Sequence, residues 1–193
     1  MGKQIHLNKV EKLFEKSLVV DFKSVERVIG NKKSNYAKLF ISNLLKQGKI
    51  KKVGKGVYTK FSESSLAVFA FTPGYLGLQS SLSFHGLWEQ ETIPVILTTK
   101  KVRTGIRSVM DSNVLVRKID RKYFFGVEHL KEGNFYLPYS DVEKTFIDMI
   151  VFNQSIDGVV LKKIKKRIDN VKLSGYLKKY STQTKNKVMG RLG

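Results

Sequence analysis

Residues 34–60 read SNYAKLFISNLLKQGKIKKVGKGVYTK, and this stretch predicts a helix followed by a β-hairpin. Ser34 is a favourable N-cap, because its hydroxyl can accept a hydrogen bond from an unpaired backbone N–H group of the first turn. Apolar residues then recur at helical spacing as far as Gly48, a residue type that commonly follows the end of a helix. Two short β-prone runs, residues 50–53 and 57–60, flank a tip of glycine and lysine.

The residues before this stretch add two shorter helices. We expect a helix over 7–17, a short strand over 18–22, a second helix over 24–29 capped by Ser24, and a turn over 31–33. Helix, strand, helix, turn, helix and hairpin are the elements of a winged helix-turn-helix. The sequence therefore predicts such a DNA-binding domain over residues 1–60.

The predicted third helix carries a polar, basic face opposite its apolar stripe. Asn35 can pair with an adenine edge, Ser42 can contact either kind of base, and Lys38 can reach guanine or a phosphate. Lysines of the hairpin would lie along the neighbouring backbone. The predicted DNA contact comprises Lys32, Lys33, Ser34, Asn35, Tyr36, Lys38, Ser42, Lys51, Lys52 and Lys55. The alternative is a solvated amphipathic helix and an ordinary hairpin, with lysines that only confer solubility and Tyr36 half-buried in packing.

Charge is concentrated at the two ends of this chain of 193 residues, whose formal net charge is +20. Residues 1–60 hold 15 basic and 4 acidic residues, residues 61–160 hold 10 and 11, and residues 161–193 hold 11 and 1. A basic excess confined to particular segments indicates a polyanionic partner. A membrane surface is the competing polyanion, but the basic helices lack the bulky aromatic face of an interfacial helix. We therefore expect nucleic acid as the partner and no membrane.

The sequence indicates a cytoplasmic location. It contains no cysteine, which excludes disulfides, thiolate zinc sites and cysteine nucleophiles. The N-terminus lacks the apolar core of a signal peptide, and no run approaches the roughly 20 apolar residues of a membrane span.

A second domain is expected over residues 66–193, after a connection at 61–65 where the composition changes. Its predicted elements are an apolar run of undetermined type at 66–71, a turn at 72–74, a helix over 75–87, strands over 94–99, 114–119, 123–127 and 135–138, a helix over 139–153, and two or three short basic helices after 158. Ser140 and Glu143 fit a capping box for the long helix. The predicted fold class is α+β.

Several short motifs in this second domain resemble AbiEi-type antitoxins. They are PGY at 73–75, LQSSL at 78–82, HGL at 85–87, YSDVEKTFID at 139–148, LKKY at 177–180 and RLG at 191–193, together with GVY at 56–58 in the hairpin. The resemblance implies a two-domain transcriptional repressor that acts on its own operon, commonly at inverted repeats. It also implies an antitoxin of the type IV arrangement, which counteracts a nucleotidyltransferase-like toxin without a stable complex. This sequence differs from the family in two respects. Relatives tend to continue for another helix or so where this sequence ends, and the C-terminal segment of this sequence is very basic.

The last 33 residues carry more positive charge than a winged helix explains. Like charges at helical spacing repel by a few tenths of a kcal/mol per pair. We therefore predict a second anionic contact, either DNA beside the operator or the nucleic-acid substrate over which toxin and antitoxin compete. Its predicted residues are Lys162, Lys163, Lys165, Lys166 and Arg167. The alternative is a solvated basic face.

The sequence favours a protein that is not an enzyme and needs no cofactor or metal. A nuclease would need clustered carboxylates around a divalent ion with a nearby lysine. The only loose candidates are Asp111, Asp120, Glu128 and Lys131, and Glu128 and Lys131 have the wrong spacing for one face of a strand. A metal-dependent nuclease and an RNA-binding protein remain the alternative functions.

Both histidines of the second domain lack a visible carboxylate or cysteine partner in the sequence. We expect His85 and His129 to serve packing or hydrogen bonding, and we assign no role to Asp148.

Overall fold

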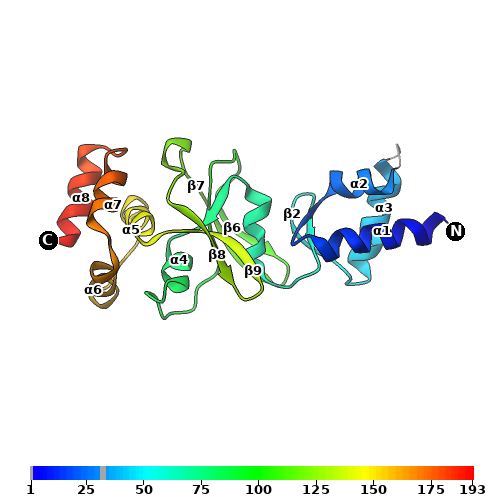
Figure 1. The fold of residues 1–193 in the computed structure, drawn as a ribbon, viewed down its shortest axis with the longest axis horizontal. Coiled ribbons are helices and arrows are strands. Elements are labelled where there is room, and N and C mark those ends of the chain that lie inside the picture. Colours follow the sequence, from blue (N-terminus) through cyan, green and yellow to red (C-terminus); the bar gives the residue numbers. More distant parts are fainter. Residues whose placement is uncertain (1, 31–33) are drawn as a thin grey trace.

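The computed structural model describes residues 2–30 and 34–193 and confirms the α+β class. Three parts follow one another along the long axis of the molecule (Figure 1). A group of helices with a small sheet occupies one end, a larger mixed sheet lies in the middle, and further helices occupy the other end. The N-terminal and C-terminal helices are therefore far apart.

The N-terminal part has the order of elements expected from the sequence. Its elements are α1 (Gly2–Lys16), β1 (Val20–Asp21), α2 (Phe22–Ile29), α3 (Ser34–Lys46), β2 (Lys51–Gly54) and β3 (Val57–Thr59), with β3 in the centre of an antiparallel three-stranded sheet. Helix α1 starts earlier than predicted, and the predicted turn at 31–33 lies outside the described residues. The expected cap Ser24 is wrong, because Asp21 accepts a hydrogen bond of 2.7 Å from the Ser24 N–H group.

One hydrophobic cluster joins these helices to the hairpin β2–β3. Val10, Val25 and Ile41, one from each helix, are at most 3% exposed. Tyr58 of β3 packs into the same cluster. The cluster fixes which face of α3 remains available for a partner.

The middle of the molecule is a six-stranded sheet in the order β6-β7-β5-β4-β9-β8. Its strands are β4 (Gly74–Leu76), β5 (Val95–Thr98), β6 (Gly105–Val109), β7 (Ser112–Lys118), β8 (Val127–Glu132) and β9 (Phe135–Ser140). The pairs β4–β9 and β5–β7 are parallel, and the other neighbours are antiparallel. Strands β6 and β8 were not predicted, because both contain several polar residues and have exposed or half-buried positions.

The helix predicted over residues 75–87 is wrong. Residues 74–76 form β4, which lies between β5 and β9, and only Gln79–Phe84 form a helix, α4. Leu78, between the strand and the helix, has φ = 53°, a positive value that is uncommon for residues other than glycine. Sheet pairing on both sides of β4 thus overrides a helical apolar pattern.

Two further segments differ from expectation. The apolar run of undetermined type is a 3₁₀ helix, η1 (Ser64–Phe71). The strand predicted over 123–127 is instead a short 3₁₀ helix, η2 (Arg121–Tyr123), followed by the start of β8. Gly126 between them has φ = 64°, and a Cβ there would lie 2.8 Å from the Lys144 Cβ. Residues in β-strands have negative φ, so the positive φ of Gly126 interrupts the predicted strand.

The sheet separates two hydrophobic clusters, because successive residues of a strand point to opposite faces. Tyr75 and Leu97 belong to the cluster with α4 and the C-terminal helices, whereas Leu76 and Ile96 belong to the cluster with η1. All four side chains are fully buried. The central sheet is therefore a layer covered on both faces.

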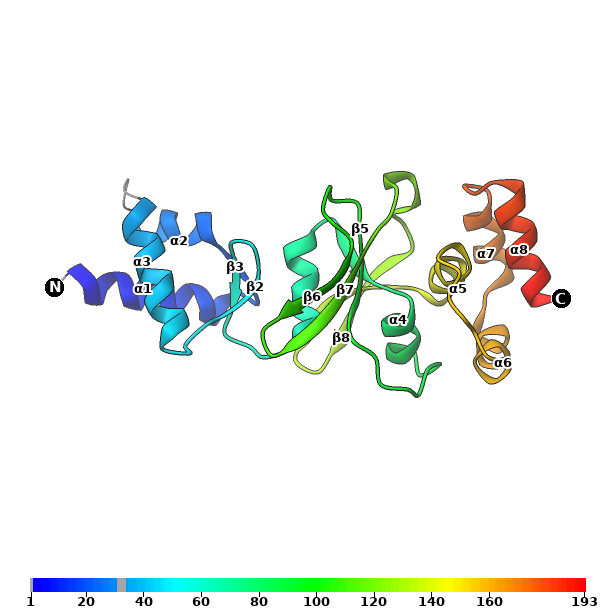
Figure 2. The ribbon, with the colours of Figure 1, turned by 180° about the vertical axis from the view of Figure 1, so that it is seen from behind.

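The hairpin β2–β3 also contacts this central part. Val53 of β2 is fully buried within the η1 cluster, not within the cluster of the N-terminal helices. A Cβ on Gly54 would lie only 2.3 Å from the Ala70 Cβ of η1. Both views show the hairpin between the N-terminal helices and the edge of the sheet at β6, which β2 also contacts (Figures 1 and 2). The hairpin therefore connects the two parts by packing.

Helix α5 (Val142–Val151) carries a buried ion pair in the middle of the molecule. The Lys144 amine donates to Asp148 one turn later, and the Tyr75 hydroxyl donates to the same carboxylate at 2.6 Å. Lys144 and Asp148 are at most 1% exposed. Burial lowers the pKa of Lys144 and raises that of Asp148, and the charge of each partner opposes the other's shift. Asp148 therefore has a structural role.

The predicted capping box of α5 is wrong. Asp141 is the N-cap and accepts from the Lys144 N–H group at 2.7 Å, while Ser140 bonds to the Thr145 hydroxyl. Glu143 accepts instead from the backbone N–H group of Asp169, on the C-terminal helices. The sequence has two adjacent candidates for the cap, and tertiary contacts select the second.

Three short helices end the chain, in agreement with the predicted two or three. They are α6 (Gly158–Arg167), α7 (Asn170–Leu177) and α8 (Thr182–Leu192). Their N-caps Asp157, Asp169 and Ser181 each accept backbone hydrogen bonds. Within the described ranges, no helix has both the length and the apolar character needed to cross a bilayer.

The close approach of Gly54 to Ala70 gives a first prediction. Gly54→Ala should destabilise the protein by about 1–3 kcal/mol, because the added methyl group must push the hairpin away from η1. Denaturant unfolding measures this change. Gly175→Ala is the matched control: its Cβ would meet open space within helix α7, so this variant should be as stable as the parent or more so. Equal stability of both variants would contradict the packing described here.

The buried ion pair gives a second prediction. Lys144→Met should cost about 3–5 kcal/mol of unfolding free energy, because it leaves the buried Asp148 carboxylate without its counter-charge. The triple variant Lys144→Met, Asp148→Leu, Tyr75→Phe removes all polar members and should recover much of that loss. Chemical denaturation of the three proteins compares them. A triple variant no more stable than the single one would show that the network matters for its geometry and not its charge.

Candidate nucleic-acid interface

Helix α3 exposes several of the residues predicted to read DNA. Asn35 and Lys38 are exposed and Ser42 is half-buried, and their spacing of three and four residues places them on one face. Leu39, which was not among the predicted contacts, is 60% exposed beside them. Its position outside the apolar stripe of the helix could have indicated this exposure. An exposed aliphatic group on this face can contact a thymine methyl group.

Tyr36 packs inside the N-terminal part instead of standing free. It is half-buried, with its ring 5.7 Å from the His6 ring and 6.3 Å from the Phe40 ring, measured between centroids. These contacts favour the packing alternative for Tyr36. Lys32 and Lys33 lie outside the described residues, and Ser34 is the first residue of α3.

The three hairpin lysines differ in their availability. Lys52 and Lys55 are exposed, one on β2 and one at the turn. Lys51 is half-buried, and its amine donates to the Ser62 hydroxyl at 2.8 Å. Lys52 and Lys55 are therefore the hairpin residues best able to meet phosphates.

The C-terminal basic cluster is partly neutralised within the chain. Lys162, Lys165 and Lys166 are exposed on α6, as is Arg167. Lys163 is half-buried and forms an ion pair with Glu89. One of the five predicted members thus already has a counter-charge, and the remaining four stay candidates for the second anionic contact.

Lys172 of α7 is a further basic residue with partners inside the chain. Its amine lies 3.1 Å from Asp141, 3.4 Å from Glu143 and 3.6 Å from Glu128. Partial burial alone would lower the pKa of Lys172, but the hydrogen bond and charge of Asp141 raise it overall. This cation ties α7 to the start of α5 and is not available for DNA.

The structure separates the residues considered for a nuclease. Asp111 lies at the turn between β6 and β7, whereas Glu128 and Lys131 belong to β8 at the opposite edge of the sheet. Asp120 accepts from the Lys122 N–H group as the cap of η2. Among the described residues, no group of three or more His, Asp or Glu side chains could hold a metal ion.

The two histidines of the second domain have different surroundings. His85 Nε2 lies 2.9 Å from the Ser140 carbonyl oxygen, in keeping with the predicted hydrogen-bonding role. His129 is exposed on β8.

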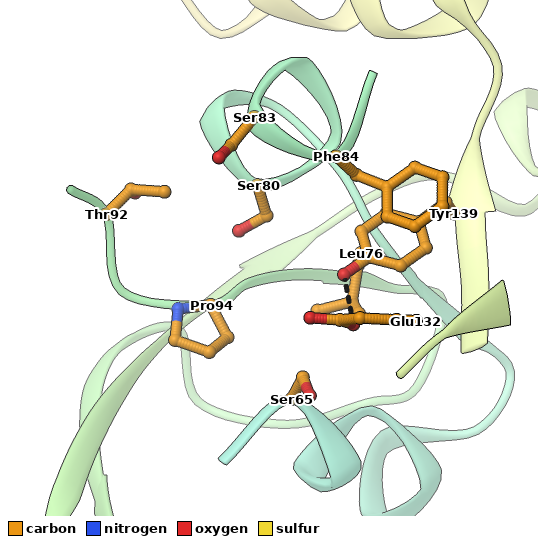
Figure 3. A pocket seen from close by; sticks show the side chains of 9 residues that line it. All are labelled: Ser65, Leu76, Ser80, Ser83, Phe84, Thr92, Pro94, Glu132 and Tyr139. Atoms are coloured by element: carbon orange, nitrogen blue, oxygen red, sulfur yellow. Dashed lines mark hydrogen bonds between the residues drawn. The ribbon is translucent and has the colours of Figure 1, made fainter. Parts of the chain in front are cut away.

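A small pocket of about 170 Å³ opens between α4, β8 and β9 (Figure 3). The Tyr139 hydroxyl donates to Glu132 at 2.6 Å, and the Phe84 ring stacks on Tyr139 with centroids 4.3 Å apart. Burial, followed by the neighbouring Glu132 carboxylate, raises the pKa of Tyr139. The Ser80 hydroxyl accepts from the Val95 N–H group at 2.7 Å. With a carboxylate on its wall and none of its described lining residues basic, this pocket is unsuited to a polyanion.

Comparison with known proteins shows similarity of fold alone. No protein-family model and no curated protein matches the chain. Among solved structures, it is similar to the crystal structure of the Rv2827c protein from Mycobacterium tuberculosis, with a TM-score of 0.64 and 15% identity. The similarity covers 97% of this chain and 76% of that one. At this identity the match concerns the whole fold, including both ends, and not the chemistry of any site.

The exposed lysines of α6 give a third prediction. Reversing the charge of Lys162, Lys165 and Lys166 to glutamate should weaken binding to a long duplex and lower the magnitude of its log–log salt slope by about 1 for each lost contact. Titration of labelled duplex at several salt concentrations measures both quantities. Because α6 and α3 lie at opposite ends of the molecule (Figure 1), the duplex must be long enough to span them.

The control for this variant is charge reversal at Lys118, Lys122 and Lys131, three exposed lysines of the middle part. It should leave the slope closer to that of the parent. If the α6 variant folds, keeps the affinity and salt slope of the parent and still neutralises a toxin partner, the second anionic contact does not exist.

Proposed function

We propose that this protein is a sequence-specific duplex-DNA-binding repressor built on an N-terminal winged helix-turn-helix, with α3 as the recognition helix and β2–β3 as the wing. The observation that carries the proposal is the exposed face of α3. It presents an amide, an ammonium group and an aliphatic side chain from Asn35, Lys38 and Leu39, and α3 contains no acidic residue. Two exposed lysines follow on the hairpin.

These groups match the chemistry of a major groove. An α-helix fits the groove, where an asparagine amide can donate to and accept from one adenine edge. Lysines that meet phosphates supply affinity and orientation without reading sequence. The hydrophobic cluster that joins α3 to the hairpin fixes the angle between base-reading and phosphate-binding residues.

The proposal extends to the autoregulating antitoxin of a type IV toxin–antitoxin pair, acting in the cytoplasm. The motifs shared with AbiEi-type antitoxins support this part. The functional partner of this protein would be a nucleotidyltransferase-like toxin that forms no stable complex with it. The operator would contain inverted repeats. In this reading residues 66–193 form the antitoxin domain and perform no catalysis, and neither domain uses a cofactor.

Removing the Asn35 amide tests this function. Duplexes selected from a random pool by the parent protein supply the specific site. Asn35→Ala should reduce discrimination between that site and unselected duplex by about 1–3 kcal/mol, because one bidentate base contact is lost. Competition titration measures the ratio of the two affinities.

Asn186→Ala, the same change on the exposed surface of α8, is the control and should leave that ratio unchanged. Equal weakening of specific and unselected DNA by Asn35→Ala would mean that Asn35 reads no base. If the parent selects no common sequence from the pool, the repressor proposal itself fails.

A further inference from the structure

A basic cleft lies where the hairpin meets the central sheet. Its volume is about 490 Å³, and its walls come from β2, the turn after it, the end of η1, the segment after β5, and β6. Four cations line it: Lys52 and Lys55 from the hairpin, and Lys100 and Arg107 from the middle part. None of the described residues that line it carries a carboxylate. The cleft therefore concentrates positive charge from two parts of the chain.

Internal contacts hold the two cations of the middle part in place. The Lys100 amine donates to the Ala70 carbonyl oxygen at 3.0 Å, which leaves two of its three N–H donors for a ligand. The Arg107 guanidinium carbon lies 5.5 Å from the centre of the Phe71 ring, and the same group donates to the Arg103 carbonyl oxygen. These contacts hold the Lys100 amine and the Arg107 guanidinium group at the wall of the cleft, and none of them is with a carboxylate.

The walls of the cleft are a firm support for its cations. Val53, Phe71 and Val109 line it, and all three are buried in the hydrophobic cluster behind it. Cations on low-dielectric walls produce a stronger field than the same cations on an open surface. Two of the four cations belong to the hairpin that directly follows α3, so a duplex that contacts both α3 and these hairpin lysines would lie next to this cleft. This continuity favours the DNA backbone over a free anion.

We infer that this cleft binds the sugar–phosphate backbone of duplex DNA beside the segment held by α3, with Lys100 and Arg107 as phosphate-binding residues supplied by the second domain. The inference rests on the proposed DNA binding and adds residues from outside residues 1–60. It also gives the hairpin a second role, because its packing on η1 forms one wall of the cleft.

Charge removal on the two sides of the cleft tests the inference. Lys100→Gln keeps a donor for the Ala70 carbonyl, and Arg107→Gln keeps a planar donor group near Phe71. Each should lower the magnitude of the log–log salt slope for a random duplex by about 1, which corresponds to roughly eightfold weaker binding at 0.1 M salt. Arg107→Lys retains the charge and should retain most of the affinity. Titrations of labelled duplex over a series of salt concentrations supply these values, and melting temperatures verify folding.

Lys131→Gln is the matched control, because this exposed lysine lies on β8 at the edge of the sheet opposite β6. It should leave both affinity and slope unchanged. Lys52→Gln and Lys38→Gln report on the hairpin and on α3. If these two variants lower the slope while Lys100→Gln and Arg107→Gln do not, the middle part supplies no phosphate contact, so the inference fails and the proposed function stands. If the parent binds no duplex with a measurable salt slope, the proposed function fails and the inference fails with it.

Discussion

The contact between β2 and η1 determines how the N-terminal helices are arranged relative to the central sheet. Tyr58 of the hairpin packs with the N-terminal helices, whereas Val53 is buried in the cluster with η1 and the central sheet. Gly54 permits that burial, because any side chain at this position would collide with Ala70. The absence of one Cβ atom thus lets the hairpin serve two hydrophobic clusters at once.

This shared hairpin has consequences for the proposed DNA binding. A free wing would let the N-terminal helices move independently of the sheet, whereas a packed wing fixes the face of α3 relative to Lys100 and Arg107. Fixed positions favour binding, since less conformational freedom is lost when phosphates are contacted at several points. The buried Lys144–Asp148 pair stabilises the opposite face of the same sheet, where Tyr75 of β4 meets α5. The sheet is therefore anchored on both faces.

Local patterns were sufficient to predict α3, the hairpin, α5 and the three C-terminal helices, because each has a clear apolar period or turn signal. They failed where sheet pairing decided the outcome: residues 74–76 form a strand because β5 and β9 lie on either side of them. They also failed for the cap of α5, where Glu143 bonds to a segment distant in sequence. Lys100 and Arg107 could not be found from the sequence, because only tertiary structure brings them beside the hairpin.

The ion pairs within the chain change which cations can be expected to bind an anionic partner. The net charges of the segments suggested basic ends and a nearly neutral middle. Yet Lys163 and Lys172 at the basic C-terminal end are paired with carboxylates. The middle contributes two cations to the cleft, whose described lining residues include no acid. Net charge per segment counts paired and unpaired cations alike. The unpaired ones can release counterions when they meet phosphates, so they determine the salt dependence of binding. By this criterion the proposed DNA-binding surface includes the middle of the chain as well as the N-terminal helices.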